Sequence, residues 1–142
     1  LAEQLDLLAP KISFLSIGTN DLTQFLFAAD RANPKLAERY DWLSPAILRF
    51  LRRVIRSVDG HDVDIAVCGE MGGRRLEALA LLGLGIRRLS ITPAAVGPTK
   101  DLVSKVDLQE IGAAMEQWLA HPPEDMRAAL TAWAAERGIT VD

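Results

Sequence analysis

Apolar residues recur along the chain in two patterns, short continuous runs and helical spacing. The continuous runs predict buried strands at Ile12–Ile17 and Val63–Cys68, and Arg88–Ile91 is interpreted as a short third strand. Segments with apolar residues three or four positions apart predict helices, which occupy Leu1–Ala9, a short stretch after Asp21, the region from Ser44-Pro45 to Val58, Arg74–Leu82, and Pro93 to about Lys105. This alternation of strand and helix is typical of an α/β fold with a parallel sheet.

From Val106 to the end, the chain has a purely helical pattern. Asp107 with Glu110 resembles a capping box, and the apolar stripe from Leu108 to Leu119 predicts a helix. His121-Pro122-Pro123 breaks this helix, and a last helix follows. The sequence therefore divides into a strand–helix part and a helical extension, over residues 1–120 and 121–142.

Three strand–helix units are too few to close an eight-stranded (β/α)8 barrel, which takes about 250 residues. The chain opens without an initiator methionine, and Leu1, Leu5 and Leu8 already follow helical spacing. We therefore expect a fragment of a longer protein.

Composition narrows the class of protein. The 142 residues are 49% hydrophobic, which allows one domain with a real core, and the net charge of −3 argues against nonspecific nucleic-acid binding. Cys68 is the only cysteine, which excludes an internal disulfide or multi-cysteine metal site and fits the cytoplasm. The sequence contains no run of about 18 apolar residues and no leader, so we expect a soluble protein that does not associate with a membrane.

The first two predicted strands both end in polar, glycine-containing sequences. These are Gly18-Thr19-Asn20-Asp21 and Cys68-Gly69-Glu70-Met71-Gly72-Gly73. The C-terminal rim of a β/α barrel is where catalytic residues lie, so both sequences are candidate site segments. Two simpler interpretations stay open at this point: Asn20 caps the following helix, and Cys68 is a buried structural cysteine.

The helix that begins at Ser44-Pro45 carries four arginines opposite its apolar side, at positions 49, 52, 53 and 56. A phosphate site is one interpretation. We favour a solvated outer face, because charged residues on the polar side of an amphipathic helix ordinarily face water.

Three stretches together resemble the phosphoenolpyruvate-utilising enzymes: Ser16–Gln24, Asp30-Arg31-Ala32-Asn33 and Cys68–Gly73. Their order and spacing match the C-terminal TIM barrel of Enzyme I of the bacterial phosphotransferase system. The resemblance covers roughly Leu1–Leu119, and the helical extension is similar to the nitrogen-related form. Pyruvate phosphate dikinase and phosphoenolpyruvate synthase share the first and third motifs and are the alternative within the superfamily.

The resemblance implies that the fold is the C-terminal portion of a TIM (β/α)8 barrel, with about three β/α units. It also implies transfer of a phosphoryl group from phosphoenolpyruvate to a histidine on another domain of the same enzyme, leaving pyruvate. Cys68 would be the general acid that protonates the enolate, because a thiol is mostly protonated at neutral pH. Asn20, Thr19 and Arg31 would bind the substrate. Asp21 would be a ligand of the Mg²⁺ cofactor.

Other parts of the family's site lie outside this sequence. They are the phosphorylated histidine, a second magnesium ligand (a glutamate) and further phosphate-binding arginines. We therefore expect the chain to be inactive by itself. The resemblance also implies a homodimer and a downstream phosphocarrier protein as partners. A non-catalytic dimerisation module is the alternative from a different class of function.

Overall fold

The computed structural model describes residues 1–30, 33, 35–36 and 41–142. Three strands form a parallel sheet in the order β1-β2-β3, and they are β1 Phe14–Gly18, β2 Asp64–Cys68 and β3 Arg88–Ser90. The α/β class and the positions of the three predicted strands are confirmed, with strand ends shifted by at most two residues. The burial expected for the first two is wrong, since Ile17 and Val67 are the only buried residues of the three strands.

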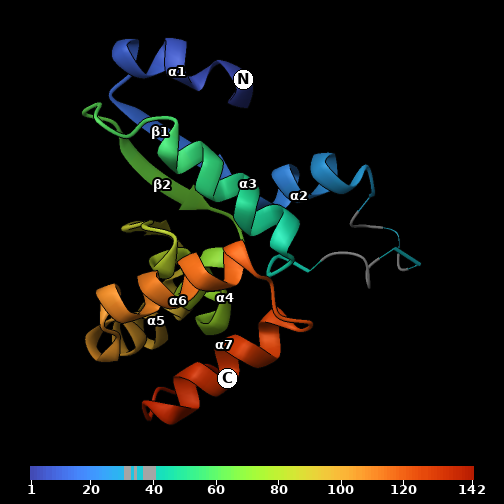
Figure 1. Ribbon diagram of the computed structural model, residues 1–142, viewed down its shortest axis with the longest axis vertical. Helices are drawn as coiled ribbons and strands as arrows, with labels where there is room; N and C mark the ends of the chain where they lie inside the picture. Colours follow the sequence, from blue (N-terminus) through green and yellow to red (C-terminus); the bar gives the residue numbers. More distant parts are fainter. Residues whose placement is uncertain (31–32, 34, 37–40) are drawn as a thin grey trace.

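Helices connect the strands and form the whole C-terminal part of the chain (Figure 1). They are η1 Ala2–Gln4, α1 Leu5–Leu8, η2 Ala9–Lys11, α2 Thr19–Phe27, α3 Pro45–Arg56, η4 Met71–Gly73, α4 Arg75–Gly83, α5 Pro93–Lys105, α6 Leu108–Ala120 and α7 Met126–Glu136. Helix α1 lies at one end of the long axis and α7 at the other. None of the helices in the described ranges is long and apolar enough to cross a membrane.

The predicted first helix, Leu1–Ala9, is wrong in detail. The segment forms η1, α1 and η2 in succession, with no side-chain cap bond at any of their starts. Only Leu5 and Ala9 are buried, so little tertiary packing supports a continuous helix, and short helices are marginal without it. Pro10 occupies the first turn of η2, where its missing N–H has no cost.

The two faces of the sheet differ. Helix α3 runs alongside β1 and β2 (Figure 1), and its Leu48 and Leu51 join one apolar cluster with Ile17 and Val67. Side chains alternate along a strand, so the neighbours of Ile17 and Val67 point to the opposite face. That face is open in the described part of the chain, where Phe14 is 71% exposed.

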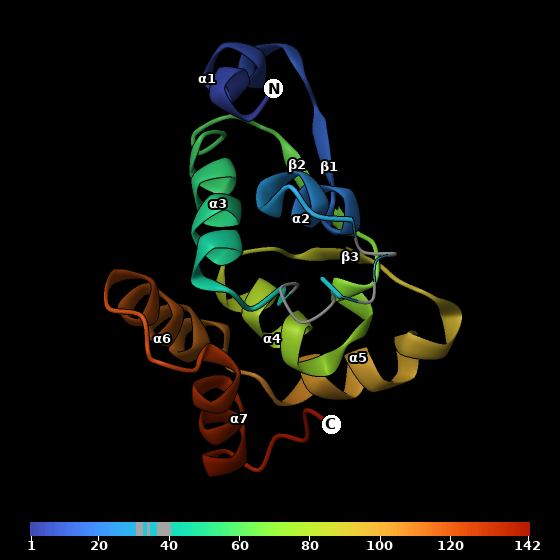
Figure 2. The same cartoon turned by 90° about the vertical axis from the view of Figure 1, so that its right-hand side faces the viewer.

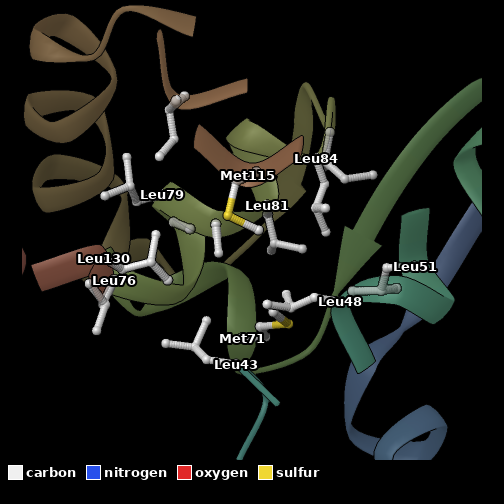
Figure 3. Packing of buried hydrophobic residues seen from close by; sticks show 14 of the residues in the cluster. Leu43, Leu48, Leu51, Met71, Leu76, Leu79, Leu81, Leu84, Met115 and Leu130 are labelled. Atoms are coloured by element: carbon white, nitrogen blue, oxygen red, sulfur yellow. The ribbon is translucent and has the colours of Figure 1, made fainter. Parts of the chain in front are cut away.

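Helix α4 is the centre of the core (Figure 3). Every residue from Leu76 to Leu82 is buried, and α5, α6 and α7 all contact this helix. Gly83 lets α6 approach closely, since a Cβ at this position would lie 2.5 Å from Met115 Cγ. Leu130 and Trp133 carry α7 into the same cluster, so the predicted helical extension shares the core of the strand–helix part.

The capping box predicted for α6 is only half formed. Asp107 Oδ1 accepts hydrogen bonds from the backbone N–H groups of Gln109 (2.8 Å) and Glu110 (3.1 Å), as an N-cap residue should. The Glu110 side chain does not close the box, because its Oε2 accepts a hydrogen bond from Arg137 Nε at 2.8 Å instead. A tertiary partner has replaced the local one.

The solvated outer face predicted for the arginines of α3 is also wrong in part. Helix α6 packs beside α3 (Figure 2), which the local sequence pattern cannot show. Arg49 donates two hydrogen bonds to the Leu119 carbonyl oxygen, and the Arg52 side chain is only 13% exposed. Arg49, Arg53 and Arg56 are exposed residues, as predicted, although Arg49 also contacts α6.

Candidate functional site at the ends of β1 and β2

The two polar strand ends meet because β1 and β2 are in parallel register. Gly18 is paired with Cys68, so the residues that follow each strand leave the sheet side by side. Thr19 begins α2 and is fully buried, and its Oγ1 donates a hydrogen bond to the Cys68 carbonyl oxygen at 3.1 Å. This bond fixes the start of α2 against the end of β2.

Asn20 joins the two segments rather than capping the helix. The N-cap of α2 is Gly18, with no side-chain cap bond, so the capping interpretation of Asn20 is wrong. Its Nδ2 donates to Glu70 Oε1 at 3.3 Å, and its Oδ1 accepts from the Glu70 backbone N–H at 3.4 Å. The amide has a second Nδ2 proton, which leaves it able to donate to a substrate.

Gly69 makes this pairing possible. Its φ of +107° lies in a region that residues with a side chain rarely adopt. A Cβ at this position would also lie 2.8 Å from Thr19 Oγ1 and 3.3 Å from Asn20 Oδ1. The loop after β2 can therefore approach the start of α2 only with glycine here.

Cys68 lies on the open face of the sheet and is half-buried, in contrast to its fully buried neighbour Val67. It is a free cysteine. Ser16 Oγ donates to Cys68 Sγ at 3.6 Å, so the thiol proton is not used in this bond and can be directed to another acceptor. Gly18, opposite in the sheet, has no side chain to cover the sulfur, and even a Cβ built there would be 4.0 Å from Sγ.

Asp21 is exposed in the first turn of α2, where the helix dipole favours negative charge. It lines a pocket of about 610 Å³ with other residues of α2 and with Ala28, Ala29 and Asp30. Within the described ranges, no group of three or more His, Cys, Asp or Glu residues could hold a metal ion. Mg²⁺ in enzymes commonly takes one or two carboxylates together with water and substrate phosphate, and Asp21 offers one exposed carboxylate of this kind.

The structure thus brings Thr19, Asn20 and Cys68 together, while Arg31 lies outside the described residues. Sequence reasoning did not assign Ser16 and Gly69 a part in the site. Strand alternation was a usable signal for Ser16, because it lies two residues before Gly18 and so shares its face. The close approach at Gly69 had no local signal.

The fold and this geometry define an α/β protein with a polar site at the carboxyl edge of a parallel sheet, the usual place for ligands in such folds. The chain belongs to the family of PEP-utilising enzymes, matching the model of their PEP-binding domain over residues 1–108. The resemblance inferred from the sequence is therefore confirmed. Most of α6 and all of α7 lie beyond the matched residues.

Individual relatives agree with the family. The chain is 44% identical over 104 residues to a phosphoenolpyruvate-protein phosphotransferase of Borreliella burgdorferi, covering 73% of this chain and 18% of that protein. It is 38% identical over 133 residues to an Escherichia coli protein named for the phosphoenolpyruvate-dependent phosphotransferase system. This match covers 93% of this chain and 18% of that protein. A multiphosphoryl transfer protein of Xanthomonas campestris is 46% identical over 99 residues, which cover 70% of this chain and 12% of that protein. The chain therefore spans less than a fifth of the length of these relatives.

Proposed function

We propose that the chain carries part of the phosphoenolpyruvate site of a phosphoenolpyruvate–protein phosphotransferase of the Enzyme I type. The observation that carries this proposal is the joining of the two strand ends, which places the Cys68 thiol beside Thr19 and Asn20 in a member of the PEP-utilising family. The names of the relatives favour a phosphotransferase over a dikinase or synthase.

In this proposal, the P–O bond of phosphoenolpyruvate breaks as the phosphoryl group passes to a histidine on another domain. The enolate that remains takes a proton at carbon 3 from the Cys68 thiol, giving pyruvate, and the thiolate regains a proton from solvent. The Ser16 hydroxyl supports this role, because it donates to the sulfur and so leaves the thiol proton available for the enolate.

In this proposal, the substrate is bound by residues near the thiol. Asn20 would donate its remaining amide proton to the substrate, and Thr19 would hold the start of α2 in place while its backbone contributes contacts. Arg31 would bind the phosphate with its planar guanidinium group. Mg²⁺, which neutralises charge on the phosphoryl group when bound, would take Asp21 as one ligand.

We also propose that the three strand–helix units are the C-terminal portion of a (β/α)8 barrel in the cytoplasm. The open sheet supports this: in the described part of the chain β1 and β3 each pair with β2 alone, and Phe14 is exposed on the face that a barrel would enclose. A histidine-bearing domain of the same enzyme and a downstream phosphocarrier protein would be its partners.

The proposal is tested with Cys68→Ala in a complete enzyme that contains this segment. Loss of a general acid should slow pyruvate formation by about 10²-fold or more. Ser90→Ala is the matched control, since Ser90 is the register partner of Cys68 on β3 and shares its face without a thiol. Unchanged turnover in Cys68→Ala, or an equal loss in both variants, would contradict the general-acid role.

A non-catalytic dimerisation module is the second candidate. Exposure of Phe14 (71%) and Phe25 (85%) favours it, because large apolar residues left in water promote self-association. Light scattering of the 142-residue chain tests this candidate. A homodimer is expected under this candidate, and a stable monomer at high concentration would count against it.

A further inference from the structure

A groove of about 560 Å³ lies between α3 and the C-terminal end of α6. Four arginines of α3 line one side, and Glu116, Leu119 and Ala120 line the other. The arginines are Arg49, Arg52, Arg53 and Arg56. Their spacing puts them on one side of the helix, so their side chains converge on the same groove.

Two of these guanidinium groups meet at a single oxygen atom. Arg52 Nη2 and Arg56 Nη2 both donate to Glu116 Oε2. The Glu116 side chain is 59% exposed, so it can leave this position at little cost. An exposed carboxylate oxygen thus occupies a point where an oxygen of a bound anion would accept two hydrogen bonds.

The groove holds more positive than negative charge. Glu116 and Glu3, which pairs with Arg53 at 2.7 Å, are the carboxylates that contact the four arginines in the described structure, leaving an excess of two positive charges. Arg49 is directed to the Leu119 carbonyl oxygen at the negative end of α6. Burial and the neighbouring Arg56 lower the pKa of Arg52, so a further anion would relieve this crowding.

We propose that this groove binds a phosphate-bearing small molecule, with a phosphate replacing the Glu116 carboxylate between Arg52 and Arg56. The volume falls within the range of small-molecule sites, about 300–1,000 Å³. Arginine suits phosphate because its planar fork can donate two parallel hydrogen bonds to it. A hollow in which two guanidinium groups meet favours a compact ligand over the surface of a protein partner.

The proposed site is separate from the one at the strand ends. Leu48 and Leu51 face the apolar cluster that includes the sheet, and the arginines project from the other side of α3. Helix α3 therefore stands between the groove and Cys68. The inference does not rest on the phosphotransferase proposal, and either can fail without the other.

The test is calorimetric titration of inorganic pyrophosphate into the 142-residue chain at low ionic strength. We expect saturable binding at one site, weakened about 10-fold by Arg56→Gln, which removes one charged donor. The Arg56 side chain is 62% exposed, so this change should leave the fold intact. Glu116→Gln should tighten binding severalfold, because it removes the competing carboxylate.

Three controls decide the interpretation. Lys100→Gln removes one exposed positive charge elsewhere, on α5, and should leave binding unchanged. Asn20→Ala should also leave it unchanged, whereas loss of binding in this variant would move the site to the strand ends. Citrate, an organic anion of similar charge, should bind at least about 10-fold more weakly if phosphate geometry matters. Equal binding of citrate, or equal losses in Arg56→Gln and Lys100→Gln, would overturn the proposal.

Discussion

Arg127 offers a sharp test of the packing between α7 and the rest of the protein. Its Nη2 pairs with Glu77 Oε1 on α4 at 2.9 Å and with Asp41 Oδ1 at 2.7 Å. The Glu77 side chain is only 3% exposed, so Arg127→Met would leave a buried carboxylate without this cation. We predict that this variant is clearly destabilised.

The expected loss of unfolding free energy in Arg127→Met follows from how deeply the two partners are buried. Removing one partner of a fully buried ion pair costs about 3–5 kcal/mol. The Arg127 side chain is 43% exposed, so water can partly replace it, and we expect a loss of about 2 kcal/mol. For a domain of this size that corresponds to a fall in Tm of about 6 °C. The hydrogen bond that Arg127 donates to Asp41 raises the pKa of Arg127 more than the one to Glu77 does, so its charge and this contribution should persist into alkaline pH.

Urea denaturation of the variants measures the effect. Arg88→Met is the control, because the Arg88–Asp64 pair is exposed on both sides and should contribute less than about 1 kcal/mol. Adding Glu77→Gln to Arg127→Met removes the buried charge and should recover part of the loss. If Arg127→Met costs no more than Arg88→Met, the reasoning from the buried carboxylate is wrong.

Two further predictions concern α4, α5 and α6. Gly83→Ala should cost about 2 kcal/mol of unfolding free energy in urea, because its Cβ would collide with Met115, whereas Gly112→Ala meets only an ordinary contact at 3.8 Å and should not destabilise. Lys105→Gln should raise the pKa of Asp101, measured by NMR titration of its carboxyl carbon, because the Lys105 hydrogen bond holds that pKa below its usual value. Any stability from Asp101 is then present above the ordinary aspartate pKa and is lost as pH falls through the lowered one. An unshifted titration in Lys105→Gln would refute the assignment.

Much of the fold could be predicted because local pattern and tertiary packing agree. The runs Ile12–Ile17 and Val63–Cys68 are apolar enough to be strands in any arrangement that buries one face. Helix α4 is apolar around much of its circumference, and it is therefore largely buried beneath other helices. Where a segment depends on a distant partner, prediction failed. The Glu110 side chain pairs with Arg137 instead of closing the cap, and Arg52 is covered by α6, which comes about sixty residues later in the sequence.

The site shows the same division between local and tertiary information. Each polar strand end could be recognised separately, but the contact of Asn20 with Glu70 depends on how far β1 and β2 are offset. A shift of one residue in this register would turn Cys68 or its partner to the opposite face of the sheet. The offset is set by burial of Ile17 and Val67 as a pair, a property of the packed core.

Register also explains why glycine lies at two positions of the site. Gly18 is the partner of Cys68, and a larger residue there would extend over the open face beside the sulfur. Gly69 follows the thiol and lets the loop come within contact distance of Thr19 and Asn20. One glycine leaves space for a ligand next to the thiol, and the other brings the polar groups up to it. The reactive geometry is therefore built as much by absent side chains as by the polar residues themselves.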